Sequence, residues 1–66
     1  MNVNQIIKAA EKQVSLKRVV IWNPFISRAL YVGDKNEVPK TIQNKQVIAY
    51  RYDKDKERMI IRVQSS

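Results

Sequence analysis

Residues 46–64 (QVIAYRYDKDKERMIIRVQ) decide the fold more than any other stretch of the chain. Two runs in which apolar and polar residues alternate, 46–53 and 57–64, flank the charged segment Lys54-Asp55-Lys56. Alternation on both sides of a short polar turn is typical of a β-hairpin. The sequence therefore predicts two antiparallel strands in this part of the chain.

The register of this hairpin follows from how its side chains sort between two faces. A turn with an even number of loop residues places Tyr52 opposite Met59 or Glu57 and keeps one face uniformly apolar. A slip by one residue would bury arginines, so we expect the even register. The apolar face then carries Ile48, Tyr50, Tyr52, Met59, Ile61 and Val63, and the other face carries Val47, Ala49, Arg51, Arg58, Ile60 and Arg62.

A second hairpin is predicted upstream. Residues 17–22 (KRVVIW) are mainly β-branched and aromatic and stop at Asn23-Pro24, and residues 28–33 (RALYVG) predict the next strand. A five-residue loop, 23–27, joins the two strands. We expect Phe25 in this loop to fold back against the core.

Both faces of this upstream hairpin are apolar. Val19 and Ile21 point to one side, whereas Val20 and Trp22 point to the other. One short helix covers only one face of a sheet, so the second face must meet a second subunit, another partner or the far wall of a barrel.

The N-terminal part predicts a helix over residues 3–14. Its apolar residues recur at intervals of three and four and so form one stripe. Asn2 or Asn4 is suited to cap its first turn, because a short polar side chain accepts from an unpaired backbone N–H. The stripe consists of Val3, Ile6, Ile7, Ala10 and Val14. We expect Ile48, Tyr50, Ile61 and Val63 of the second hairpin to pack beneath Ile6, Ile7 and Ala10 of this stripe.

The middle segment, residues 34–46, is polar and contains Pro39. Proline suits the first position of a helical turn, so one turn is predicted over 39–43, with Ile42 anchored in the core. Asn44 follows this turn and is the non-glycine residue best suited to a left-handed backbone conformation.

These elements predict an α+β fold in which an N-terminal helix packs on a mostly antiparallel four-stranded sheet, in the order α-β-β-β-β. The chain length of 66 residues allows a single domain, residues 1–66. The alternative architecture is a strongly curled sheet that closes towards a small barrel.

The residue types present argue against catalysis. The chain contains neither cysteine nor histidine, so it lacks disulfides, thiolate metal ligands and the usual general base near neutral pH. Its only glycine is Gly33, which is too few for a phosphate-binding loop. The serines and the threonine lack a histidine or cysteine that would activate them. We therefore expect a protein that is not an enzyme and that uses no cofactor and no metal.

The charge balance favours a polyanionic partner. Thirteen Lys and Arg against six Asp and Glu give a net charge of +7, and a basic domain attracts nucleic acid first of all. Trp22 and Tyr31 are candidate platforms for base stacking. We expect a small accessory protein that binds DNA or RNA through a cationic sheet face. The candidate nucleic-acid-binding residues are Lys17, Arg18, Arg28, Arg51, Arg58 and Arg62.

The alternative is a protein-interaction module that uses an apolar sheet face, as a homo-oligomer or as a subunit or inhibitor of a larger assembly. The two-sided hairpin favours a homodimer, because small domains often need a second subunit to cover apolar surface. No stretch is long enough to span a bilayer and no signal peptide is visible, so we expect a cytoplasmic protein without a membrane partner. The candidate interface residues are Trp22, Tyr31, Val47, Ala49 and Ile60.

Overall fold

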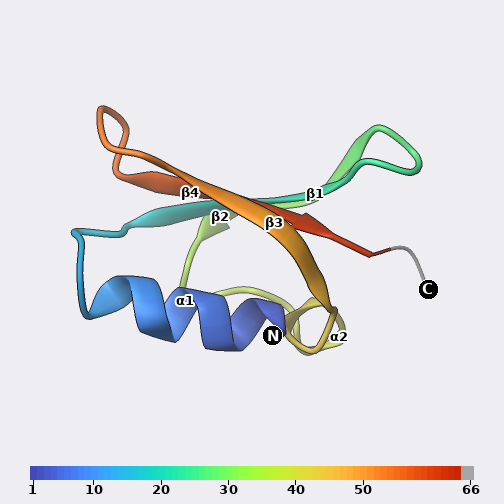
Figure 1. Cartoon of the computed structure of the whole chain (residues 1–66), viewed down its shortest axis with the longest axis horizontal. Coiled ribbons are helices and arrows are strands. Elements are labelled where there is room, and N and C mark those ends of the chain that lie inside the picture. The colour runs from blue at the N-terminus through green and yellow to red at the C-terminus, as the bar shows by residue number, and fades with distance from the viewer. Residues whose placement is uncertain (65–66) are drawn as a thin grey trace.

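Two helices and four strands follow one another along the chain in the computed structural model, which describes residues 1–64 (Figure 1). The N-terminal helix and the four strands confirm the expected α+β class. The short second helix corresponds to the turn predicted around Pro39. The elements are α1 (Val3–Glu11), β1 (Arg18–Asn23), β2 (Arg28–Asp34), α2 (Lys40–Gln43), β3 (Val47–Asp53) and β4 (Arg58–Val63).

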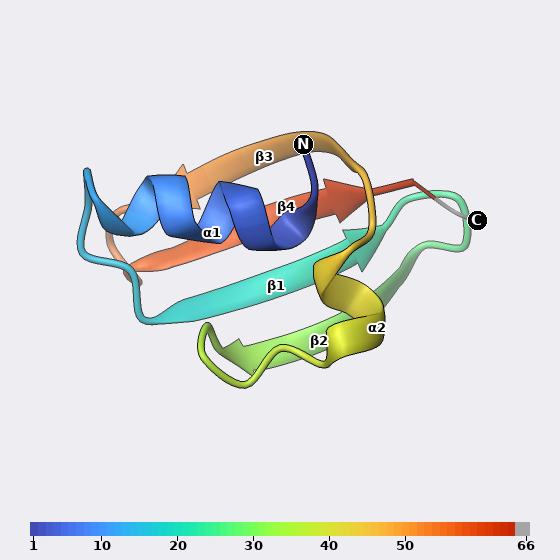
Figure 2. The same ribbon diagram turned by 90° about the horizontal axis from the view of Figure 1, so that it is seen from below.

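The four strands form one open sheet in the order β2-β1-β4-β3 (Figure 2). The two hairpin pairs, β1 with β2 and β3 with β4, are antiparallel. The hairpins are joined at the centre of the sheet by β1 and β4, which run parallel. The sheet is therefore mixed but dominated by antiparallel pairs. It has two edges, β2 and β3, and does not close into a barrel.

Helix α1 begins with a reciprocal cap. The Asn2 side chain accepts from the Gln5 backbone N–H at 2.9 Å, and the Gln5 side chain accepts from the Asn2 N–H at 2.9 Å. Each of these bonds satisfies a donor that has no partner inside the helix. The helix ends at Glu11, three residues before the expected end, so Val14 lies outside it and is partly exposed.

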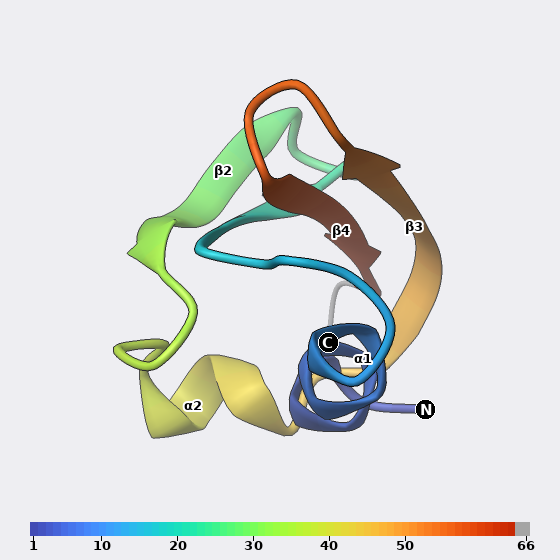
Figure 3. The ribbon, with the colours of Figure 1, turned by 90° about the vertical axis from the view of Figure 1, so that its left-hand side faces the viewer.

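Both helices cover the same face of the sheet. Figure 3 shows α1 below β3 and β4 and α2 below β2. Burial of apolar surface between these two layers is the main source of stability. No element within residues 1–64 covers the opposite face of the sheet, as Figure 1 also shows. The core between sheet and helices consists of Val3, Ile6, Ile7, Leu16, Val19, Ile21, Val38, Ile42, Met59, Ile61 and Val63.

The second hairpin has the expected even register. Tyr52 lies opposite Met59, and Asp53 lies opposite Arg58 across a four-residue turn. The expected inward position of Ile48 is wrong, because a β-bulge between Val47 and Ala49 shifts the alternation there. Val47 packs against the core instead, and Ile48 is 53% exposed.

Left-handed backbone conformations occur in the hairpin turns and not after α2. Ser27 and Glu57, the last residues of the two turns, each have φ of 50°. Asn44 has φ of −92°, so the expected left-handed conformation there is wrong. Its backbone N–H caps the short helix through the Ile42 carbonyl in a right-handed conformation.

Candidate functional site

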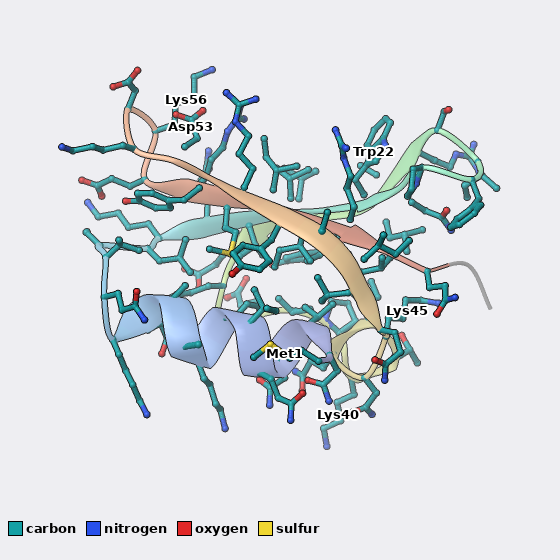
Figure 4. All side chains as sticks on the ribbon, in the orientation of Figure 1. Met1, Trp22, Lys40, Lys45, Asp53 and Lys56 are labelled. Atoms are coloured by element: carbon teal, nitrogen blue, oxygen red, sulfur yellow. The ribbon has the colours of Figure 1, made fainter. Side chains whose placement is uncertain are left out.

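The surface of the sheet that no element in the described residues covers is here called the outer face, and it is built from alternate residues of the four strands. A β-bulge in the β1–β2 pair interrupts the alternation on β2 and sets Ala29 opposite Trp22. The strand registers align these residues into three rows that run across β2, β1, β4 and β3. Figure 4 shows Trp22 on this face, on the side of the sheet away from α1. The first row is Asp34, Arg18, Arg58 and Asp53, the second is Val32, Val20, Ile60 and Arg51, and the third is Ala29, Trp22, Arg62 and Ala49.

The first row balances its own charge. Arg18 and Arg58 are direct neighbours on β1 and β4, and like charges in this position repel. Each has a carboxylate on its other side, because Asp34 lies opposite Arg18 and Asp53 lies opposite Arg58. The Arg58 Nε is buried and lies 3.4 Å from an Asp53 carboxylate oxygen. This row therefore adds little net charge to the outer face.

The other two rows carry two arginines and no acidic residue. Arg51 and Arg62 are exposed, and neither forms an ion pair with any residue in the described range 1–64. Arg62 lies beside Trp22 across the parallel β1–β4 pair and beside Ala49 on β3. Positive charge on the outer face is therefore concentrated over β4 and β3, next to an aromatic side chain.

The β1 and β2 side of the same two rows is apolar. Val20 and Trp22 on β1 are half-buried by their neighbours, whereas Val32 on the edge strand β2 is 62% exposed. Ile60, also half-buried, extends this apolar surface onto β4. Apart from Ile60, the outer face thus has an apolar half over β1 and β2 and a cationic half over β4 and β3. Val20 and Val32 were not among the residues expected at the interface, although the alternation along 17–22 already placed Val20 beside Trp22.

The turn between β1 and β2 extends the apolar half beyond the sheet. Phe25 is 65% exposed and Ile26 is also exposed, so the expectation that Phe25 folds back against the core is wrong. Asn23, only 5% exposed, accepts from the Phe25 backbone N–H at 2.9 Å and fixes the turn. Figures 1 and 3 show this hairpin bending towards the side away from the helices. The sequence Asn-Pro-Phe at residues 23–25 was the available signal for this turn, because asparagine side chains often accept from the backbone N–H two residues later.

The remaining predicted cations lie at the margins of the outer face. Lys17 precedes β1, and its Nζ lies 3.3 Å from a Glu57 carboxylate oxygen. Arg28 begins β2, opposite the inward-facing Asn23. The structure thus brings four of the six predicted cations onto one face, two of them with carboxylates alongside, and leaves Lys17 and Arg28 at its ends.

The five predicted interface residues divide between the two faces. Trp22, Ala49 and Ile60 lie on the outer face, whereas Tyr31 and Val47 pack against the core on the inner face. The Tyr31 hydroxyl donates to the Asp34 carbonyl at 2.8 Å. Loss of hydration against its neighbours raises the pKa of the Tyr31 hydroxyl, and the carboxylates of Glu37 and Asp34 raise it further.

A separate apolar groove runs between α1 and the edge strand β3. Tyr50 faces it and is 61% exposed, so its expected burial beneath the helix is wrong, whereas Tyr52 packs against the core. The Tyr52 hydroxyl donates to the Ser15 carbonyl at 2.7 Å. The groove is lined by Met1, Ile6, Ala9, Ala10, Gln13, Val14, Tyr50, Tyr52 and Met59, none of which is a nucleophile paired with a base.

Within residues 1–64, no three acidic side chains come together in a group that could hold a metal ion. Neither helix in this range is long and apolar enough to cross a membrane. Comparison of the chain with protein-family models, with curated proteins and with solved structures gives no significant match.

Proposed function

We propose that this chain is a small non-catalytic accessory protein that binds nucleic acid through the outer face of its sheet. The observation that carries the proposal is the position of Arg51 and Arg62, exposed and without acidic partners in the described residues, on the same uncovered face as Trp22. Guanidinium groups bind phosphate oxygens in a bidentate geometry, and an adjacent aromatic ring offers a surface for a base.

The charge of the whole chain supports the same proposal. A net charge of +7 on 66 residues raises the local concentration of a polyanion around the molecule. The first row of the outer face is close to neutral, so the phosphate contacts are assigned to the second and third rows. Arg18 and Arg58 then lie at the edge of the surface that contacts the nucleic acid. Lys17 and Arg28 add electrostatic attraction at longer range.

A pair of matched double variants tests this assignment. Arg51→Ala/Arg62→Ala removes two cations from the outer face. Lys8→Ala/Lys12→Ala removes two exposed lysines, one in α1 and one at its C-cap, on the other side of the sheet. Both lower the net charge equally. Fluorescence anisotropy with mixed-sequence oligonucleotides should show about a tenfold or greater loss of affinity for the arginine variant and a much smaller loss for the lysine variant. Equal losses would show that binding depends on total charge and not on this face.

The alternative proposal is a protein-interaction module, and a specific observation favours it. Val32 is 62% exposed and continues across the sheet into Val20 and Ile60, so the outer face contains a row of apolar surface that a second copy or another protein could cover. Light scattering after size exclusion detects a homo-oligomer. An apolar contact weakens little with salt, whereas phosphate contacts weaken steeply, so salt dependence separates the two proposals.

A further inference from the structure

We infer that the ligand of the outer face is single-stranded nucleic acid, and that Phe25 at the tip of the β1–β2 hairpin is a second stacking platform beside Trp22. This inference rests on the proposed function and narrows it to one class of nucleic acid. It also assigns a role to the exposed β1–β2 turn, because phosphate binding alone requires no aromatic side chain there.

The apolar and cationic halves of the outer face match the bases and the phosphates of a single-stranded nucleic acid. Its apolar half lies over β1 and β2 and its free cations lie over β4 and β3, in the same two rows. Neighbouring strands of a sheet are about 4.8 Å apart, so Arg62 lies one strand away from Trp22 and Arg51 lies two strands away. A single strand that runs along the sheet can place its bases over Trp22 and its phosphates over the arginines.

A duplex cannot use this arrangement. Its bases are stacked on one another, so their flat faces are closed to Trp22 and only phosphates and groove edges remain accessible. The major groove admits an α-helix or a two-stranded β-ribbon. Each hairpin here is part of one four-stranded sheet, which is wider than such a ribbon. Both helices lie on the opposite side of the sheet, as Figure 3 shows. A duplex would therefore contact the arginines and gain nothing from the apolar half.

The turn holds Phe25 in a fixed exposed position. The buried Asn23 side chain accepts from the Phe25 N–H at 2.9 Å, and Ser27 closes the turn in a left-handed conformation. With 65% of its surface exposed, Phe25 contributes little to the core and is accessible to a ligand. Because the backbone of the turn is already ordered, a base that stacks on Phe25 would lose little additional conformational entropy from the protein. Phe25 follows Trp22 by three residues and extends the same end of the outer face.

The test compares mixed-sequence single strands of about 12 nucleotides, a length within the usual site sizes, with the duplex of the same sequence. Both are titrated against the full chain by anisotropy at low salt and at equal phosphate concentration. We expect the single strand to bind at least about tenfold more tightly, since stacking adds about five- to hundredfold per base. The fluorescence of Trp22, the only tryptophan, should be quenched by the single strand and much less by the duplex.

Two neighbouring variants test the role of the turn. Phe25→Ala should weaken single-strand binding about five- to hundredfold. Ile26 is also exposed but has no ring, so Ile26→Ala should change the affinity less than about twofold. Because both side chains are exposed, circular dichroism should show an unchanged fold in each variant. Equal effects of the two variants, no effect of Phe25→Ala, or duplex binding as tight as single-strand binding would overturn this inference and leave the proposed function standing. No binding of either nucleic acid at low salt would instead overturn the proposed function itself.

Discussion

Ile61 offers the most direct test of which sheet face forms the core. Its side chain is fully buried on β4, with Ile21 beside it on β1 and Tyr50 beside it on β3. Ile61→Ala removes three carbon groups, and each buried group contributes about 0.8 kcal/mol, which gives about 2.4 kcal/mol. The cavity left under α1 adds about 24 cal/mol per Å³. We expect a total loss of about 3–5 kcal/mol in the free energy of unfolding.

This loss is comparable with the whole stability of a small domain. At about 0.05–0.15 kcal/mol per residue, 66 residues give about 3–10 kcal/mol. Ile61→Ala is therefore expected to leave the domain marginally folded or unfolded. The smaller change Ile61→Val, which costs about 0.5–1.5 kcal/mol, keeps the measurement within range. Urea unfolding followed by far-ultraviolet circular dichroism gives the free energy for both variants.

The neighbouring residue supplies the control. Ile60 precedes Ile61 on the same strand but points to the outer face, where it is only half-buried. Ile60→Ala should cost clearly less than Ile61→Ala, because the residue lies outside the core and its surroundings already contact water. A loss for Ile61→Ala that is no larger than the loss for Ile60→Ala would refute the assignment of the inner face.

Three further changes test local features by thermal unfolding. Asn2→Ala removes the side-chain acceptor of the capping box and should cost about 0.5–2 kcal/mol. Ser27→Gly should raise the melting temperature and Ser27→Val should lower it, because φ of 50° suits glycine and strains a β-branched residue. Gly33→Ala places a Cβ 2.9 Å from the Tyr31 hydroxyl oxygen and should destabilise the domain, and Tyr31→Phe in the same chain should recover part of that loss.

The elements were predictable from local pattern, because each depends on neighbouring residues. The alternation in 46–64 gave the second hairpin and its register, since only one register keeps Arg58 and Arg62 out of the core. The parallel pairing of β1 with β4 was not predictable in this way. It joins strands that are about forty residues apart, as Ile21 and Ile61 show, and no turn between them fixes the register.

The errors arose where backbone geometry overrides simple alternation. The bulge at Ile48 exchanges the positions of Val47 and Ile48 relative to the core, and periodicity alone does not reveal a bulge. Phe25 was expected inside because large aromatic residues usually are, yet Asn23 holds its backbone in an outward-facing turn. Glu57 rather than Asn44 adopts the left-handed conformation, because a four-residue hairpin turn requires it there.

Part of the candidate site was predictable from the sequence. Alternation along the second hairpin grouped Arg51, Arg58 and Arg62 on one face, and the structure retains that grouping. The charge balance within the first row was not predictable, because it depends on Asp34 of β2 lying opposite Arg18 of β1. The same holds for the adjacent positions of Trp22 and Arg62, which depend on the central parallel pair.

The central claim, that the outer face binds nucleic acid, is tested most directly by a salt series on the unmodified chain. Mixed-sequence DNA and RNA oligonucleotides are titrated by fluorescence anisotropy, first at about 50 mM and then at about 200 mM monovalent salt. We predict measurable binding at the lower concentration and about a tenfold weaker affinity at the higher one, because contacts to a few phosphates release counterions. Absence of binding at low salt, where electrostatic attraction is strongest, would contradict the claim and favour a protein partner for this face.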